Sequence, residues 1–165
     1  MIGQHAKYLA HLSFGFPSAR GRIWGLFCIC RTMPSIIEIA TPDSVSNLVL
    51  RDLAERANGG RSRRFIAKFE EREVGFLCYD DWTDQSNGFI YEIYVLPAYR
   101  AKGIGNSLLS FAEDLARSLG CTSIRLAPHA FDGTVSPDML LSWYGDKGYV
   151  PMSGDASKLE KALAN

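Results

Sequence analysis

The hydrophobic pattern of the chain switches between the period of a strand and that of a helix, which predicts an α+β fold. Alternating or short apolar runs predict strands at 35–40, 64–70, 73–79, 89–96, 122–127, 149–152 and 158–163. Helical spacing predicts helices at 42–57 and 104–119, and a third that starts at 136–137. This order predicts a mixed, mostly antiparallel central sheet flanked by helices on both faces.

The helix after Gly103 has the clearest pattern. Ile104, Leu108 and Leu119 recur at helical spacing, and Gly120 is suited to end the helix. We expect Ile104 to be the first side chain that this helix buries.

The first helix is expected to begin at a cap followed by a proline. Thr41 is the predicted N-cap and Pro42 the first helical residue, and Asn58–Gly60 is expected to end the helix. Its buried face is predicted to contain Val45, Leu48, Val49 and Leu53.

The length of the chain indicates one domain, and its charge balance indicates no strong electrostatic field around it. The 165 residues carry 18 basic and 18 acidic side chains, a net charge of zero, which argues against a nucleic-acid substrate. Arg61, Arg63 and Arg64 form a small basic cluster that we interpret as a solvated turn. No apolar run is long enough to span a bilayer, so we expect no membrane partner.

The four cysteines show neither zinc spacing nor a Cys-x-x-Cys pair. They are interpreted as reduced thiols in a cytoplasmic protein, with the two later ones buried, and no metal site is expected. These residues are Cys28, Cys30, Cys78 and Cys121.

Residues 1–33 are expected to form an extension, and 34–165 the folded domain. The stretch from Met1 to Ile37 holds no acidic residue but four basic ones, as in transit peptides. An over-extended reading frame before a start at Met33 is the favoured alternative, together with a poorly ordered tail.

A short basic turn with two glycines joins the strand at 89–96 to the clearest helix. The turn is Arg100-Ala101-Lys102-Gly103-Ile104-Gly105, and its free backbone N–H groups at a helix start are suited to phosphates. One residue between the glycines excludes the mononucleotide P-loop, and Leu108 stands where the dinucleotide fingerprint needs a third glycine.

This turn resembles the pyrophosphate-binding signature of the GNAT superfamily of acyl-CoA-dependent N-acetyltransferases. The strand segment Glu92–Pro97 before it and the segment Leu141–Tyr149 downstream resemble further parts of that family's pattern. The resemblance covers roughly Ser35 to the C-terminus. It implies transfer of an acetyl group from acetyl-CoA to a primary amine by direct attack on the thioester.

The resemblance also implies site residues. The loop and helix start would hold the pyrophosphate through Arg100, Ala101, Lys102, Gly103, Ile104, Gly105, Asn106 and Ser107. The backbone of Tyr94, Val95 and Leu96 would pair with the pantetheine arm.

Two residues are the catalytic candidates. Glu92 would act as the general base, unless it only binds a substrate cation, and Tyr144 would protonate the CoA thiolate, unless it is a core aromatic. Trp143 and Tyr149 are interpreted as core aromatics. His129 lies where family members often carry an asparagine that contacts the cofactor, so that contact is in doubt.

The sequence does not decide whether the acceptor is a small-molecule amine or a protein amine. It also does not decide whether the protein forms a homodimer. A non-catalytic acyl-CoA-binding regulatory module is the main alternative function. An acetyltransferase directed at nucleic acid is a third, against which the neutral charge counts.

Overall fold

The computed structural model describes residues 33–57, 59–130 and 133–164. The predictions for the N-terminal extension, Cys28 and Cys30 lie outside these residues. The strands are β1 (Ser35–Glu38), β2 (Ser62–Phe69), β3 (Arg72–Trp82), β4 (Asn87–Val95), β5 (Ser123–Leu126), β6 (Val150–Met152) and β7 (Asp155–Ala162). The helices are α1 (Leu48–Arg56), α2 (Ile104–Ser118) and α3 (Pro137–Gly145).

The seven strands form one sheet in the order β1-β2-β3-β4-β5-β7-β6. Its pairs are antiparallel except for β4 and β5, which run parallel. The predicted mixed, mostly antiparallel sheet is therefore confirmed.

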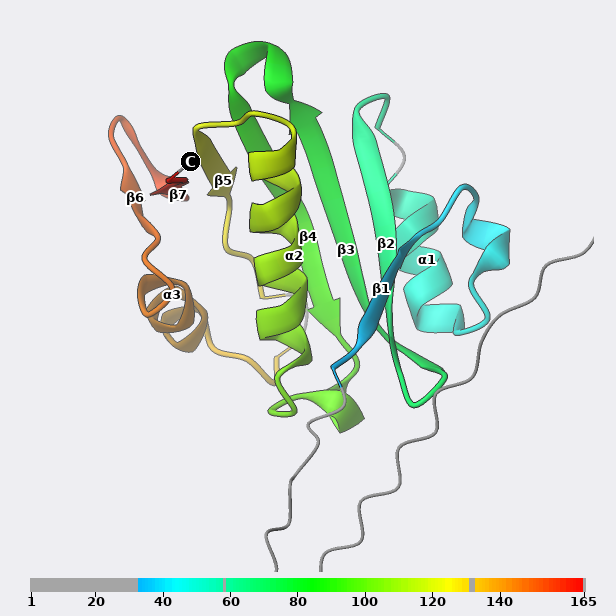
Figure 1. Cartoon of the computed structure of the whole chain (residues 1–165). Coiled ribbons are helices and arrows are strands. Elements are labelled where there is room, and N and C mark those ends of the chain that lie inside the picture. Colours follow the sequence, from blue (N-terminus) through cyan, green and yellow to red (C-terminus); the bar gives the residue numbers. More distant parts are fainter. Residues whose placement is uncertain (1–32, 58, 131–132, 165) are drawn as a thin grey trace, which may run out of the picture. The chain divides into compact units, whose positions relative to one another are not determined.

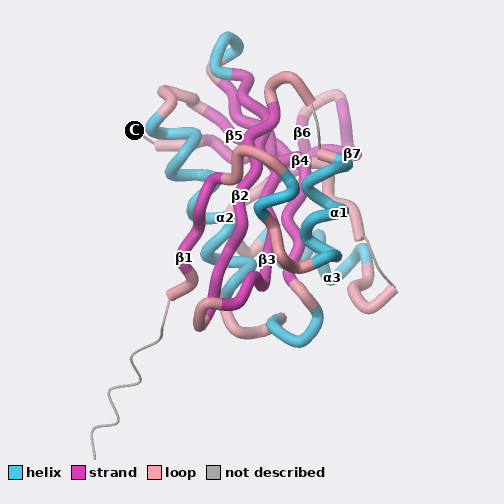
Figure 2. The backbone as a smooth tube through the Cα atoms, turned by 90° about the vertical axis from the view of Figure 1, so that its right-hand side faces the viewer, coloured by secondary structure: helices cyan, strands magenta, loops and turns pink. Residues whose placement is uncertain are grey.

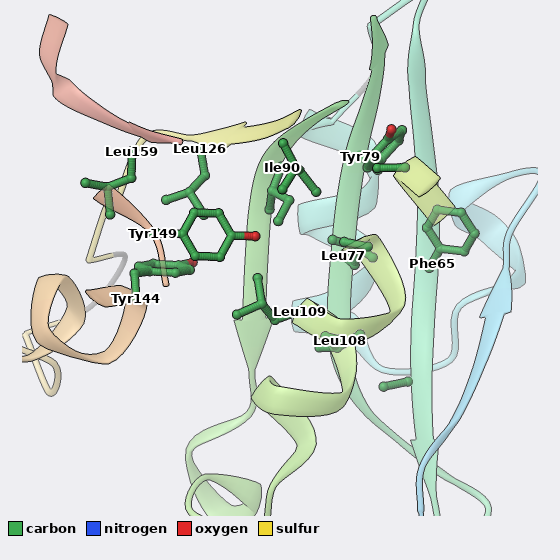
Figure 3. Packing of buried hydrophobic residues seen from close by; sticks show 14 of the residues in the cluster. Phe65, Leu77, Tyr79, Ile90, Leu108, Leu109, Leu126, Tyr144, Tyr149 and Leu159 are labelled. Atoms are coloured by element: carbon green, nitrogen blue, oxygen red, sulfur yellow. The ribbon is translucent and has the colours of Figure 1, made fainter. Parts of the chain in front are cut away.

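Side chains of β2 and β3 alternate between two hydrophobic clusters, one on each face of the sheet. Phe65 and Leu77 belong to the larger cluster, which α2 completes with Leu108 and to which α3 also contributes. Ile66 and Phe76 belong to the other, which α1 completes. Figure 1 shows α2 in front of the sheet and α1 behind it, and Figure 2 shows the sheet between them. The prediction of helices on both faces is confirmed, and Figure 3 shows the larger cluster around Leu77 and Leu108.

The first helix begins later than predicted. Pro42–Ser44 form one 3₁₀ turn, and Thr41 makes no side-chain cap bond. The cap of α1 is Asn47, whose Oδ1 accepts two backbone N–H groups of the next turn at 3.1 and 3.2 Å. The backbone N–H of Asn47 donates to Glu73 of β3 at 2.7 Å. A distant strand residue therefore fixes where the helix starts.

The late start also changes which side chains α1 buries. Leu48 and Val49, predicted to be buried, are 73% and 49% exposed, because they lie in the first turn on the outer face. Leu50 takes their place in the core, and Val45 and Leu53 are buried as predicted.

Residues 80–88, which the sequence places between two predicted strands as a polar loop, are mostly strand. β3 continues to Trp82, β4 starts opposite it at Asn87, and a 3₁₀ turn at Thr83–Gln85 joins them. Residues 80–82 are only half-buried and residues 83–86 are exposed, so polar side chains are tolerated in this part of the sheet. Polarity alone therefore misled the prediction.

β4 and β5 pair along only part of their length. The parallel ladder runs from Asn87 to Ile90 on β4 and ends at Leu126 on β5, while β4 continues to Val95. The ladder with β3 also shifts register here, where Tyr91 is left without a partner. Figure 1 shows β5 beside one end of β4. The remaining edge of β4 carries no neighbouring strand among the described residues.

The last two predicted strands form an antiparallel hairpin, with β7 between β5 and β6. β7 begins at Asp155, three residues before the predicted start. None of the helices in the described part of the chain is long and apolar enough to cross a membrane.

The basic cluster lies at the start of β2 and not in a solvated turn as predicted, and its side chains are partnered within the domain. Its two ion pairs have N–O distances of 2.7 Å, and the third arginine donates to two backbone carbonyls. The pairs are Arg61–Asp84 and Arg63–Glu38, and Arg64 bonds Ala40 and Ala54. Cys78 and Cys121 are buried as predicted, and burial raises the pKa of Cys78 to about 12.

A buried carboxylate holds the C-terminal hairpin against α2. Glu113 of α2 is 7% exposed, and Lys161 of β7 donates to its two oxygens at 2.9 and 2.8 Å. The hydroxyl of Tyr149 donates to the same carboxylate at 3.2 Å, and Arg117 lies 3.6 Å away. Because Tyr149 packs edge-to-face against Tyr144, this network also positions α3.

We therefore expect Lys161→Met to destabilise the fold. The change leaves the buried Glu113 carboxylate with only Tyr149 and the more distant Arg117 as partners. We expect the free energy of unfolding to fall by about 2 kcal/mol. Urea denaturation measures it. The double variant with Glu113→Gln should recover part of the loss, whereas equal losses in the single and double variants would contradict the role of the charge.

Candidate active site

The turn between β4 and α2 aims backbone N–H groups away from the domain core. Gly103 has a φ of 87° and is the cap of α2. The N–H of Ser107 donates to the Gly103 carbonyl at 3.0 Å, so the N–H groups of Ile104, Gly105 and Asn106 precede the first intrahelical bond. The side chain of Ile104 is 1% exposed in the core, as predicted, and only its backbone faces the site.

A hollow of about 280 Å³ lies over this turn, here called the loop hollow. It is lined by Val95, Arg100, Ala101, Gly103, Gly105, Asn106 and Trp143. A Cβ on Gly105 would lie 3.8 Å from Trp143 and 3.9 Å from Val95, without a clash. Glycine at 105 therefore keeps space open for a ligand rather than for protein atoms.

A second, mostly apolar cavity of about 290 Å³ adjoins the loop hollow on the side of α3. It is lined by Ile93, Tyr94, Val95, Arg100, Gly105, His129, Ala130, Val135, Met139, Leu140, Trp143 and Tyr144. Four residues line both spaces, namely Val95, Arg100, Gly105 and Trp143. The polar helix start therefore leads directly into the apolar cavity beside the free edge of β4.

The backbone of β4 faces two ways along this edge. The N–H of Leu96 donates to Val74 of β3 at 2.9 Å, so Leu96 is directed away from the cavity. Because backbone groups alternate along an antiparallel ladder, Tyr94 also pairs with β3, while Ile93 and Val95 point to the free edge. The backbone groups directed to the free edge are therefore those of Ile93 and Val95, not those of Tyr94 and Leu96 as predicted, and Tyr94 lines the cavity with its side chain.

Arg100 joins the end of β4 to the loop before α3. Its Nε donates to the Val95 carbonyl at 3.0 Å, and its guanidinium bonds the Thr134 hydroxyl. The guanidinium carbon also lies 5.7 Å from the ring centroid of Tyr94. Arg100 thus forms part of the cavity wall as well as supplying positive charge.

The remaining loop residues face a third hollow of about 260 Å³. It is lined by Met33, Pro34, Lys102, Gly103, Asn106, Ser107 and Ser110. Lys102 lies with its Nζ 4.8 Å from the ring of Tyr99, and Ser107 donates its hydroxyl to Gly103 at 3.3 Å. The structure therefore spreads the predicted loop residues over two neighbouring hollows.

Tyr144 is buried in the wall of the apolar cavity. Its ring packs edge-to-face between Trp143 and Tyr149, with centroid distances of 4.7 and 5.6 Å, and Figure 3 shows it below Tyr149. Its hydroxyl makes no hydrogen bond to any described residue. Burial raises the pKa of Tyr144 to about 12, so the phenol keeps its proton at neutral pH. The hydroxyl is a donor available to a ligand.

Glu92 lies on the opposite face of β4. It is 5% exposed, and its Oε1 is fully buried without a hydrogen bond from any described residue. Burial raises the pKa of Glu92 above its usual range, while Arg56 of α1 opposes the shift. An unpartnered buried carboxylate is costly, which marks Glu92 as a functional candidate.

Sequence reasoning missed part of the cavity wall. Trp143, interpreted as a core aromatic, lines both the loop hollow and the apolar cavity. Ile93 and the α3 residues Met139 and Leu140 were not predicted to line the site either. A usable signal was the apolar run Met139–Leu141 with Trp143 just before Tyr144 in the predicted helix.

Similarity to known proteins agrees with this geometry. The sequence profile of the Acetyltransferase (GNAT) family matches residues 33–134. The chain belongs to the GNAT family. Solved GNAT-like structures share its fold: the ribosomal-protein-S18-alanine N-acetyltransferase of Escherichia coli is 15% identical, with a TM-score of 0.59 over 81% of this chain and 96% of that one. Ard1 of Thermoplasma volcanium is 17% identical, with a TM-score of 0.57 over 80% and 99%.

Curated GNAT relatives match over a shorter segment. The thialysine N-epsilon-acetyltransferases of Mus musculus and Sus scrofa are each 36% identical over 52 residues. This segment spans 32% of this chain and 30% of each relative. Similarity to them therefore concerns a local segment of the family fold.

Proposed function

We propose that the protein is an N-acetyltransferase that transfers an acetyl group from acetyl-CoA to a primary amine. One observation carries the proposal: the open helix start of α2 leads without interruption into the apolar cavity that holds the Tyr144 hydroxyl. A ligand with an anionic middle and an uncharged, extended arm fits such a continuous space.

The residues present fit acetyl-CoA. The N–H groups of Gly105 and Asn106 and the positive end of α2 would hold the pyrophosphate, and the missing side chain at 105 gives it room. Ile93 and Val95 would offer backbone groups to the arm. Acetyl-CoA supplies the acyl group as an activated thioester.

The chain's own residues would perform the proton transfers. Glu92 would take the proton that the amine loses as its nitrogen bonds the acyl carbon, directly or through a water. Tyr144 would donate its phenolic proton to the sulfur as the carbon–sulfur bond breaks. The raised pKa of each group keeps Tyr144 protonated and makes Glu92 a stronger base than an exposed carboxylate.

Calorimetry with CoA followed by a CoA-release assay against pooled primary amines tests the proposal. We expect CoA to bind and to raise Tm, since it would bind the native state. We also expect CoA release in the presence of amine, with a mass gain of one acetyl group on the product. Binding without release for every amine would favour the non-catalytic acyl-CoA-binding module, and no binding would refute both.

We expect Tyr144→Phe to lower kcat by roughly tenfold to a hundredfold, because it removes one proton donor. The affinity for CoA and the Tm should change little, since the hydroxyl makes no bond within the described residues. Steady-state kinetics and thermal denaturation measure the two effects.

Tyr149→Phe is the matched control for Tyr144→Phe. Its hydroxyl bonds Glu113, so this variant should lose stability while keeping its turnover. Equal effects of the two variants on kcat would contradict a specific role for Tyr144.

A further inference from the structure

The face of the sheet that carries α1 is open beyond that helix. A hollow of about 410 Å³ lies there, here called the aromatic hollow, and it spans strands β3 to β7. It is lined by Asp80, Trp82, Gln85, Asn87, Phe89, Tyr91, Arg125, Met152 and Lys158. None of these side chains lines the two spaces proposed for acetyl-CoA.

The aromatic hollow and Glu92 lie on the same face of the sheet. Cys78, the cross-strand partner of Glu92, belongs to the cluster under α1. Ile90 belongs to the opposite cluster, so its neighbours Phe89 and Tyr91 point to the α1 face. The aromatic hollow therefore begins beside Glu92, across the sheet from the space assigned to the cofactor.

Strand register places opposite charges on either side of an aromatic ring in this hollow. Phe89 pairs with Asp80 of β3 on one side and with Arg125 of β5 on the other. On β3, Asp80 lies two residues after Cys78, the partner of Glu92. The row of Asp80, Phe89 and Arg125 is therefore about 7 Å from Glu92 along the strands. A carboxylate and a guanidinium thus face the same open space, one row from the proposed base.

Both charged groups keep binding capacity. The Ser62 hydroxyl donates to Oδ1 of Asp80 at 2.6 Å, which leaves Oδ2 able to accept a hydrogen bond from a ligand. Arg125 donates through Nε to Glu160 at 2.7 Å, and its Nη groups donate to no described residue. Each group is held in place by one bond and offers its other atoms to the hollow.

Asn87 adds a side-chain amide to the aromatic hollow. It is 5% exposed, and its Oδ1 accepts the Ser123 hydroxyl at 3.3 Å. Its Nδ2 donates to no described residue, although the side chain lines the hollow. Among the described residues only Glu92 Oε1 is fully buried and unpartnered, so Asn87 Nδ2 is open to the hollow and can donate to an acceptor there.

We propose that the acceptor is a free amino acid with a primary amine on a side chain of lysine's length. This proposal rests on the proposed N-acetyltransferase function. The α-ammonium group binds Asp80, the α-carboxylate binds Arg125 with Asn87 beside it, and the apolar stem lies on Phe89 and Tyr91. The four-carbon stem spans the row spacing and brings the side-chain amine to Glu92. A lysine within a protein has neither free α group, so it would leave Asp80 without a cation and the Nη groups of Arg125 without an acceptor.

A panel of four amines tests this with the full chain and saturating acetyl-CoA. The amines are L-lysine, Nα-acetyl-lysine, lysine amide and pentylamine. We expect the highest kcat/KM for L-lysine, and a loss of about tenfold or more for each blocked α group, since each removes a charged hydrogen bond. Mass analysis should place the acetyl group on the side-chain nitrogen. Equal kcat/KM for pentylamine, or a higher value for Nα-acetyl-lysine or lysine amide, would overturn the proposal.

Variants locate the binding groups. Asp80→Asn and Arg125→Gln should each reduce the preference for L-lysine over pentylamine about tenfold, mainly through KM. Asp84→Asn, whose carboxylate pairs with Arg61 outside the aromatic hollow, is the matched control and should keep the full preference. An unchanged preference in folded Asp80 and Arg125 variants would overturn the assignment. Absence of CoA release with every amine would instead refute the N-acetyltransferase function itself.

Discussion

Replacing Gly105 by leucine should abolish CoA binding and leave the protein folded. The new Cβ would meet Trp143 and Val95 at 3.8 and 3.9 Å, which are ordinary contact distances, so the helix start is not forced to move. The rest of the side chain would fill the junction of the loop hollow and the apolar cavity. Since a ligand that contacts bare backbone tolerates no side chain there, we expect a loss in affinity of roughly a hundredfold or more.

Calorimetry with CoA and thermal denaturation separate the two parts of this result. Gly105→Ala should weaken CoA less than leucine does, because one methyl group fills less of the junction. Gly145→Leu, at the end of α3 with open space around its Cβ, is the matched control and should bind CoA normally. Full CoA affinity in a folded Gly105→Leu protein would refute the placement of the pyrophosphate, and with it the proposed function.

The element that carries this site was predictable because its signals are local. Gly103 has to adopt a positive φ, Ile104 has to enter the core, and Gly120 has to end the helix, and each requirement is visible within a few residues of sequence. The family resemblance suggested that Gly103 and Gly105 leave room for a pyrophosphate, because their positions alone do not identify the ligand.

Other parts depend on contacts that the sequence does not reveal. The start of α1 is fixed by Glu73, which lies on a strand 26 residues further along the chain. The strand residues at 80–88 looked like a loop because one face of the sheet is uncovered there. Their true arrangement forms part of the aromatic hollow, so the space that we propose for the acceptor could not be predicted from the sequence.

The burial of Glu92 was also beyond sequence reasoning, although its strand position was not. Strand alternation places the residue on one face, but only the packing of α1 shows that its Oε1 is sealed from water and partners. Such a group destabilises the fold when charged, which makes Glu92 a candidate for chemistry at the site.

Glu92→Gln should therefore lower activity and raise stability together. Loss of a general base should reduce kcat/KM by about a hundredfold to ten-thousandfold, and the limb of the pH–rate profile that reports the base should disappear. Glu113→Gln, which alters the other buried carboxylate of the described residues, is the matched control. It should lose stability and keep its turnover and pH profile.

The stability gain should depend on pH with a definite sign. Because burial raises the pKa of Glu92 in the folded protein, the folded state holds this proton more tightly than the unfolded chain does. Stability is thus lost as pH rises from the ordinary carboxyl pKa of 4.5 through the raised folded pKa, and the loss is complete above it. The difference in Tm between Glu92→Gln and the parent protein should be smallest near pH 4 and grow toward neutrality. A difference that shrinks over this range would mean that the Glu92 carboxylate is stabilised in its charged form, which would contradict its role as an unpartnered, strengthened base.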